Sequence, residues 1–383
     1  MGGKWFFFAG GGTGGHIYPA IAVAEKIIEI EPAAKIHFFC STRSIDAQIL
    51  RQAGLEYTQL PAKGFGIRPG KLISFCTSFF ESERIAKEII AASPDEHRDA
   101  IVIGVGGFVA APACRAAYKL KVPVKLLNVD IKPGRANKII ARYADEIFVQ
   151  FEETVRYFKK NKVKISVVGC PLRSGFENPK PHKAIEQLGL NKSKKILLIT
   201  GASSGSENIN DAVCLLLDKL ARFTDDWQLV HLTGRANIEK VGQRYAGVKI
   251  EHKVLGYYDD MPNLLAAADL VIGRSGAVSI AEYAAAAVPS ICMPYPYHKD
   301  RHQYLNAGKL VEAGAAIIVD DLPNATDRAE WLWEELQELM KNEKQRKEMA
   351  KACKAIARLD ASYKIAEKLV HYFVAVPATA KRG

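Results

Sequence analysis

The sequence lacks an apolar stretch long enough to cross a membrane, since no run among its 383 residues approaches the roughly 20 that a spanning helix needs. The apolar run at residues 5–9 is shorter than the core of a secretory signal and leads into a glycine turn. The seven cysteines include no C-x-x-C pair, which favours buried free thiols in a reducing compartment over a disulfide framework. These absences predict a cytoplasmic protein.

The sequence also lacks the patterns of a nucleic-acid-binding protein. Its net charge is +11, and most of the excess lies before residue 173, yet there is no Lys/Arg-rich tract, zinc-finger spacing or RNP-like aromatic motif. Nucleic acid is therefore not an expected partner. A basic N-terminal half instead suits an anionic membrane surface or a phosphorylated substrate.

Strand-like apolar runs alternate with helical patterns along the chain. The expected strands are 4–9, 35–40, 101–105, 124–128, 146–150, 165–168, 195–200, 227–232, 248–251, 270–273, 290–293 and 316–319. Helices expected between them include 18–30, 107–119, 135–143, 207–222, 277–287 and 301–313. This alternation predicts an α/β fold of two doubly wound, Rossmann-like domains, with ligands beyond the carboxyl ends of their parallel strands.

A domain boundary is expected at Gly169–Arg173, which is followed by a polar stretch with several prolines. The chain then divides into an N-terminal domain at 1–172 and a C-terminal domain at 173–359. The tail from about 360 to 383 is a candidate to pack back on the first domain. Arg173 would stand at the hinge and face the cleft.

Two glycine-rich loops, Gly10–His16 and Arg274–Ala277, each separate a strand-like run from a helical pattern. Such loops present free backbone N–H groups at the positive end of a helix, which suits anionic ligands. Gly10, Gly12 and Gly15 also match the dinucleotide spacing G-x-G-x-x-G, but no acidic residue follows the second strand until Asp46. Arg43 could accept a 2′-phosphate, so an NADP-dependent oxidoreductase stays an alternative.

His16 follows the first loop and could act as a general base toward an attacking hydroxyl; the alternative is a structural loop histidine. A third glycine turn, 104–109, follows another strand, at the same edge of the cleft as the first loop. It is either part of the binding site or a tight strand-to-helix turn without a functional role. In the second half, Ser275 and Gly276 can donate N–H groups to a diphosphate. The Glu282 carboxylate can accept both hydroxyls of a ribose; the alternative is a solvated helix glutamate, which the alanines around it disfavour because they indicate close packing.

The segment 294–303 is a strand-end loop dense in hydrogen-bonding groups, as binding loops are. Its two histidines, His298 and His302, are spaced i, i+4, but no third ligand accompanies them. No metal site is therefore expected.

Together these segments resemble the MurG family of peptidoglycan glycosyltransferases, from Gly10 to about Ala316. The motifs that carry the resemblance are 11–16, 104–108, 168–173, 259–261, 274–282 and 298–307. The resemblance implies the GT-B architecture and inverting, cofactor-free and metal-independent transfer of N-acetylglucosamine from UDP-GlcNAc. The implied acceptor is the muramyl hydroxyl of lipid I, a polyprenyl-diphosphate-linked MurNAc-pentapeptide, at the inner face of the cell membrane, giving lipid II.

Carried over position by position, the resemblance makes His16 the candidate for activating or binding the acceptor hydroxyl. The implied donor-binding positions are Thr13, Gly14, Gly15, Asp130, Arg173, Ser203, Tyr258, Ser275, Gly276, Ala277, Val278, Glu282, Asp300 and Gln303. The implied acceptor-binding positions are Gly106, Gly107, Phe108 and Asn128. Asp130 stands where the family has an asparagine expected to touch the sugar, so an acceptor-only carboxylate replaces an amide. The turn 201–205 likewise departs from the family's glycine-serine-glutamine-glycine.

The apolar segment 71–80, with Lys63 and Arg68 before it, is either a membrane-contacting face or a buried core helix. Other functions also fit the pattern. One is another nucleotide-sugar enzyme on the same architecture, such as a lipid galactosyltransferase or a UDP-GlcNAc epimerase. Another is a catalytically silent scaffold that binds a sugar nucleotide.

Overall fold

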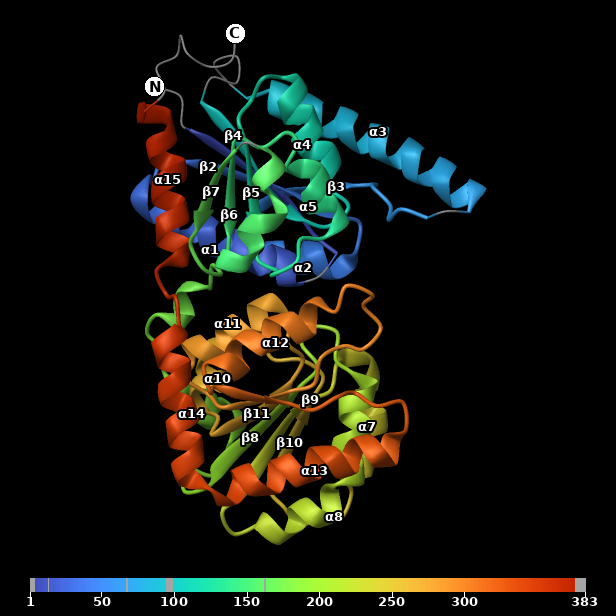
Figure 1. Ribbon diagram of the computed structural model, residues 1–383, viewed down its shortest axis with the longest axis vertical. Coiled ribbons are helices and arrows are strands. Elements are labelled where there is room, and N and C mark those ends of the chain that lie inside the picture. Colours follow the sequence, from blue (N-terminus) through green and yellow to red (C-terminus); the bar gives the residue numbers. More distant parts are fainter. Residues whose placement is uncertain (1–3, 13, 67, 94–98, 162, 376–383) are drawn as a thin grey trace. The chain divides into compact units, whose positions relative to one another are not determined.

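The computed structural model describes residues 4–12, 14–66, 68–93, 99–161 and 163–375, which divide into two compact units. Unit 1 takes in the chain up to Arg173 and again from Asp360 onward, and unit 2 is Ser174–Leu359. Each unit has its own parallel sheet with helices around it (Figure 1). The predicted α/β class of two doubly wound domains is confirmed.

The sheet of unit 1 has seven parallel strands in the order β3-β2-β1-β4-β5-β6-β7. The strands are β1 (Trp5–Gly10), β2 (Lys35–Ser41), β3 (Glu56–Leu60), β4 (Ala100–Gly106), β5 (Val124–Asn128), β6 (Glu146–Val149) and β7 (Lys164–Val167). The central strands β1 and β4 are buried along nearly their whole length, as continuous apolar runs predict for a sheet covered on both faces. The order reverses between β1 and β4, which is the switch point where such sheets bind ligands.

The helices of unit 1 pack along this sheet, as the connections between parallel strands of a doubly wound fold require. They are α1 (Gly14–Ile30), α2 (Ser44–Gln52), α3 (Pro69–Ala91), α4 (Ala110–Lys119), α5 (Arg135–Ile140) and α15 (Ala361–Ala375). Helix α15 belongs to unit 1 although unit 2 separates it in sequence. It packs beside α1, with the Phe373 ring 5.7 Å from the Phe6 ring and Lys125 Nζ 4.1 Å from the Tyr372 ring.

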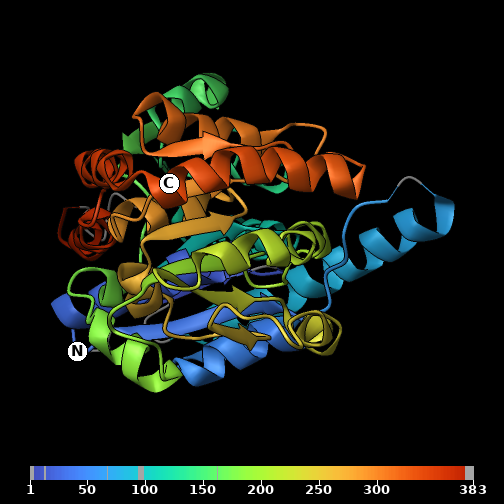
Figure 2. The same cartoon turned by 90° about the horizontal axis from the view of Figure 1, so that it is seen from below.

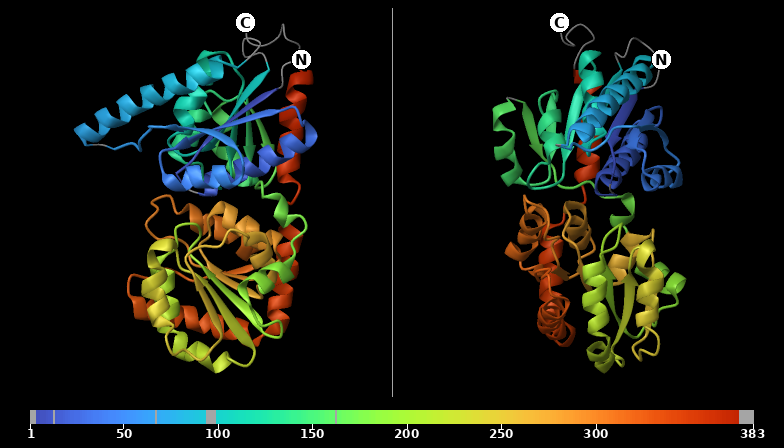
Figure 3. Two further views of the ribbon diagram at one scale, coloured as in Figure 1. Left: turned by 180° about the vertical axis from the view of Figure 1, so that it is seen from behind. Right: turned by 90° about the vertical axis from the view of Figure 1, so that its right-hand side faces the viewer.

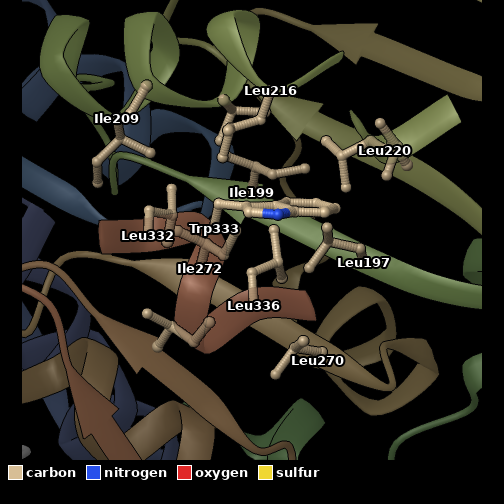
Figure 4. Packing of buried hydrophobic residues seen from close by; sticks show 14 of the residues in the cluster. Leu197, Ile199, Ile209, Leu216, Leu220, Leu270, Ile272, Leu332, Trp333 and Leu336 are labelled. Atoms are coloured by element: carbon tan, nitrogen blue, oxygen red, sulfur yellow. The ribbon is translucent and has the colours of Figure 1, made fainter. Parts of the chain in front are cut away.

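The sheet of unit 2 has six parallel strands in the order β10-β9-β8-β11-β12-β13. The left view of Figure 3 shows this sheet from behind, with the helices of unit 2 around it. The strands are β8 (Lys195–Thr200), β9 (Trp227–Leu232), β10 (His252–Leu255), β11 (Leu270–Gly273), β12 (Ser290–Cys292) and β13 (Ala316–Ile318). The helices are α6 (Pro181–Leu188), α7 (Glu207–Leu215), α8 (Leu217–Leu220), α9 (Ile238–Arg244), α10 (Met261–Ala267), α11 (Ala277–Ala285), α12 (His302–Glu312), α13 (Ala325–Lys341) and α14 (Glu343–Ile356). Side chains of α7, β8, β11 and α13 interdigitate in its core, with Trp333 among them (Figure 4).

Two strands differ from the sequence expectation. The run 248–251 is not a strand: it follows the left-handed Gly247 (φ 77°), and Ile250 enters the core from a loop while β10 begins at His252. Strand β3 was not expected, because only Leu60 in its sequence EYTQL is fully buried. Edge strands with polar faces carry a weak sequence signal.

A buried histidine is built into unit 2. The His231 ring on β9 is fully buried, with Nδ1 2.9 Å from the Tyr245 hydroxyl and Nε2 3.0 Å from Asn210 Oδ1. Burial lowers the pKa of His231 from its ordinary 6.5 to about 3. The folded state therefore keeps this ring neutral at pH values where the unfolded chain binds a proton.

This difference predicts acid destabilisation of unit 2. As pH falls through 6.5 the unfolded chain takes up a proton that the folded chain refuses until about pH 3. The free energy of unfolding should fall by up to about 1.4 kcal/mol per pH unit within that window from this group. Urea titrations at several pH values, compared with a His231→Gln variant, check this. Equal slopes in the two proteins would contradict it.

Candidate functional site

In unit 1 the loops after β1, β2, β4 and β5 meet at the carboxyl ends of the strands. The first glycine loop ends β1 at Gly10, and α1 begins at Gly14, so His16 lies in the first turn of this helix. Gly14 and Gly15 contribute orphan N–H groups of the same turn. Thr13, one of the predicted donor-binding residues, lies outside the described residues.

The third glycine turn is fitted against the His16 ring. Gly106 has a φ of 120°, and a Cβ atom there would lie 2.8 and 2.9 Å from His16 Cδ2 and Nε2. A Cβ on Gly107 would lie 2.4 Å from the Gly11 carbonyl oxygen, and Phe108 Cε1 lies 3.5 Å from the place of a Gly12 Cβ. The structure thus brings His16 together with the predicted acceptor positions of this turn.

Asn128, at the end of β5, is fully buried under its own loop. Its amide donates to the Asp130 carbonyl at 2.6 Å and its oxygen accepts from Asn137 Nδ2 at 2.8 Å. Asn137 also lies near the His16 ring, since its Oδ1 is 3.2 Å from the place of a Gly106 Cβ. Sequence reasoning did not single out Asn137, whose only signal is its place in a short helix after Gly134.

Arg173, the last residue of unit 1, lies over the face of Tyr18 in the first turn of α1, with the guanidinium carbon 4.4 Å from the ring centroid. A cation over an aromatic face is a stabilising arrangement that also orients the guanidinium plane. The structure therefore places this predicted diphosphate ligand beside the turn that carries His16.

In unit 2 the loops after β8, β10, β11 and β12 carry the other predicted donor positions. Ser275 and Gly276 precede α11, which places Ala277 and Val278 in its first turn and Glu282 further along, partly exposed. The Ser275 hydroxyl donates to the Gln303 carbonyl at 3.0 Å. Gln303 Oε1 in turn accepts from the Tyr295 N–H at 2.9 Å, so that the 274–276 and 294–303 loops are joined.

Three further donor positions lie at the same ends of the strands. Ser203 is in the loop after β8, and Tyr258 follows β10, with its phenol donating to Gln187 Oε1 at 2.7 Å. Asp300 Oδ1 lies 2.8 Å from His302 Nδ1. Partial burial raises the pKa of Asp300, but the bond and charge of His302 outweigh it, so the net shift of this pKa is downward.

The Arg274 side chain, which is 7% exposed, joins the loops that follow the strands of unit 2. It donates to the Met293 carbonyl at 2.8 Å and to the Ser206 hydroxyl at 2.6 Å, and it pairs with the fully buried Asp321 at 2.8 Å. Sequence reasoning placed Arg274 in the loop but missed Asp321, which lies 47 residues away after β13. Nothing in the sequence near Asp321 indicates a partner.

The structure gives the residues of the oxidoreductase alternative other contacts. The Arg43 guanidinium, which would have to meet a 2′-phosphate, donates to the Gly12 carbonyl, and Asp46 accepts from the Gly12 N–H at 2.8 Å. Both side chains thus hold the loop itself. Among the described residues no group of three His, Cys, Asp or Glu side chains could hold a metal ion.

Two doubly wound units, each with loops at the carboxyl ends of its strands, are the architecture of the GT-B fold, which solved glycosyltransferase structures share with this chain. Comparison with known families narrows the class. Residues 6–149 match the glycosyltransferase family 28 N-terminal domain, and residues 196–368 match the glycosyltransferase family 28 C-terminal domain. The chain belongs to glycosyltransferase family 28.

Individual relatives agree with this assignment. The UDP-N-acetylglucosamine--N-acetylmuramyl-(pentapeptide) pyrophosphoryl-undecaprenol N-acetylglucosamine transferase of Caldanaerobacter subterraneus is 33% identical over 378 residues, covering 94% of this chain and 97% of the relative. Acinetobacter baumannii MurG has the same fold, with a TM-score of 0.70 at 23% identity over 96% of this chain and 99% of that one. The fold is shared with UDP-GlcNAc 2-epimerase from Neisseria meningitidis, at a TM-score of 0.69, 14% identity and coverage of 96% and 99%. The expected resemblance to the MurG family is confirmed.

The Arg274 network predicts a large loss of stability when one partner is removed. Arg274→Ala leaves Asp321 with Arg328, at 3.4 Å, as its one cation among the described residues, so the free energy of unfolding should fall by roughly 3 kcal/mol. Urea unfolding followed by tryptophan fluorescence measures it. The double change Arg274→Met with Asp321→Leu should cost less than the single one; a greater loss in the double variant would show that the buried charge is not the cause.

Proposed function

We propose that the chain transfers N-acetylglucosamine from UDP-GlcNAc to the muramyl hydroxyl of lipid I, forming lipid II for peptidoglycan synthesis. The observation that carries this proposal is the full-length match: both family 28 domains occur in order, and a relative named for this reaction aligns with 94% of the chain at 33% identity. The acceptor binds to the N-terminal domain, 1–172, and the donor to the C-terminal domain, 173–359.

In the proposed donor site the start of α11 receives the diphosphate. Ser275 and Gly276 precede the orphan N–H groups of a nine-residue helix, where negative charge is stabilised. The guanidinium of Arg173 and the Ser203 loop add donors to the departing UDP. Glu282 accepts the ribose hydroxyls, the backbone at Tyr258 meets uracil, and Asp300, Gln303 and Asp130 accept or hold sugar hydroxyls.

In the proposed transfer the acceptor hydroxyl attacks the anomeric carbon from the face opposite to the diphosphate. The new bond to the acceptor oxygen forms as the bond to the diphosphate oxygen breaks, which inverts the configuration. The hydroxyl proton passes to the His16 imidazole, and the bonding electrons leave with UDP. No residue forms a covalent intermediate. The rate acceleration therefore comes from positioning the acceptor hydroxyl and from stabilising the departing UDP.

Helix α3 supports a peripheral position on the inner face of the cell membrane. It extends away from the sheet of unit 1 (Figures 1 and 2) and leaves Ile73 65% and Phe80 58% exposed, with Leu72 and Phe65 also exposed. Lys63 and Lys71 lie in the same exposed region, so apolar and basic groups occur together, as at a membrane interface. Of the helices that the structure describes, none is long and apolar enough to span a bilayer.

The experiment that tests the function uses the whole chain with UDP-GlcNAc and a lipid I analogue. UDP release together with a new disaccharide supports the proposal. Conversion of UDP-GlcNAc without acceptor would instead favour the epimerase alternative, which the shared fold makes relevant. Nucleotide binding without any turnover would favour the scaffold.

Two variants should separate catalysis from donor binding. His16→Ala should lower kcat by about 100-fold or more while the Kd for UDP stays unchanged, because the base acts on the acceptor. Glu282→Ala should raise the Kd for UDP at least about tenfold, since two hydrogen bonds to a carboxylate are lost. Titration calorimetry with UDP and steady-state assays measure both. Glu312→Ala, an exposed glutamate on α12, is the control; a near-normal kcat in His16→Ala would remove its role as base.

The exposed face of α3 gives a separate prediction. Ile73→Asp combined with Phe80→Asp should lower binding to anionic phospholipid vesicles at least about tenfold, because two exposed apolar side chains are lost from the interface. Turnover of a water-soluble acceptor analogue should not change. Leu215→Asp, at a site 46% exposed on α7, is the matched control. Equal vesicle binding by all proteins in a co-sedimentation assay would contradict the membrane role.

A further inference from the structure

A buried carboxylate lies directly beneath the first glycine turn. Asp46, in the first turn of α2, is 0% exposed. Its Oδ2 accepts from the Gly12 N–H at 2.8 Å, from the Ser41 N–H at 3.2 Å and from the Ser41 hydroxyl. Its Oδ1 has no hydrogen-bond donor within the described part of the chain. A buried charge of this kind is costly, and here its one satisfied oxygen serves the loop.

Gly12 is held on both of its peptide groups. The buried Asp46 carboxylate accepts a hydrogen bond from the Gly12 N–H, while the exposed Arg43 guanidinium donates one to the Gly12 carbonyl. The Gly12 N–H is therefore not available to a ligand, unlike the orphan N–H groups at Gly14 and Gly15. The hydrogen bond from Gly12 to Asp46 therefore fixes the backbone just before α1 and does not bind a ligand.

The contacts of this turn leave no room for adjustment. A Cβ on Gly11 would lie 2.5 Å from Asp46 Oδ2, and a Cβ on Gly107 would lie 2.4 Å from the Gly11 carbonyl oxygen. The neighbouring Gly106 in turn lies against the His16 ring. These distances show that the backbone at Gly11 and at the 106–107 turn packs directly against its neighbours, so we expect a displacement of Gly11 to shift the 106–107 turn and the His16 ring.

We propose that Asp46 is a positioning residue for the transfer: by fixing the Gly11–Gly12 turn it holds His16 and the Gly106–Gly107 turn in the arrangement that receives the acceptor hydroxyl. This inference rests on the proposed function, because it needs His16 to act on an acceptor. Asp46 touches no reacting atom. It acts through the backbone of the loop.

The experiment compares Asp46→Ala and Asp46→Asn with the wild-type chain under conditions where all are folded. Asp46→Ala should lower kcat by about 10- to 100-fold, as misplacement of a reacting group by about 1 Å does. Asp46→Asn keeps an oxygen that can accept from Gly12 and should recover part of that loss. The Kd for UDP should stay unchanged, because the positions proposed for its uracil and ribose, Tyr258 and Glu282, lie in unit 2.

Asp145→Asn is the matched control, since Asp145 also accepts a backbone N–H, from Val124 at 2.8 Å, but at the amino end of β5. It should lower stability and leave kcat as it is. Should Asp46→Ala not fold, Arg43→Ala releases the other side of Gly12 from the surface and should lower kcat in the same sense.

The outcomes separate the two proposals. A wild-type chain that transfers sugar while both Asp46 variants and Arg43→Ala keep its kcat overturns the positioning role alone. The positioning role is also overturned if the loss of kcat in the Asp46 variants is fully explained by their smaller folded fraction, as we expect for any loss in Asp145→Asn. A wild-type chain with no transfer overturns the proposed function, and the positioning role falls with it.

Discussion

Backbone approaches too close for a Cβ atom hold the ligand-facing edge of unit 1 together. Gly11 meets Asp46, Gly107 meets the Gly11 carbonyl, and Gly106 meets the His16 ring, each at a separation that only glycine allows. The glycine-rich motifs of this half are therefore more than loose anion-binding loops. Without these glycines, the loops that follow β1, β2 and β4 could not pack against one another. This packing also fixes the position of the His16 ring.

In unit 2 the loops are joined by close glycine contacts, such as Gly205 against the Thr233 carbonyl, and by a buried ion pair. Its loops are joined by Arg274, which reaches one carbonyl, one hydroxyl and the carboxylate of Asp321. Both units therefore combine a buried carboxylate, Asp46 or Asp321, with backbone approaches that only glycine permits.

The sequence was sufficient for the class of fold and for most strands, because strands such as β1 and β8 are continuous apolar runs buried on both faces. It was insufficient for β3, which has the polar pattern of an edge strand. It also misplaced β10, because the buried loop residue Ile250 made the run 248–251 resemble a strand. Within the site, glycine turns and His16 stood out by composition. Asp46, Asn137 and Asp321 did not, because their roles depend on contacts between segments that no local pattern records.

The route of the chain has a consequence for how the protein is made. Unit 2 is one continuous segment, whereas unit 1 needs α15, which is synthesised after the whole of unit 2. Unit 2 can complete its core during translation, while the surface of α1 and Phe6 that α15 covers stays open until α15 has been synthesised. A chain terminated before α15 would therefore combine a finished unit 2 with an incomplete unit 1, and would expose apolar surface that quality-control proteases recognise.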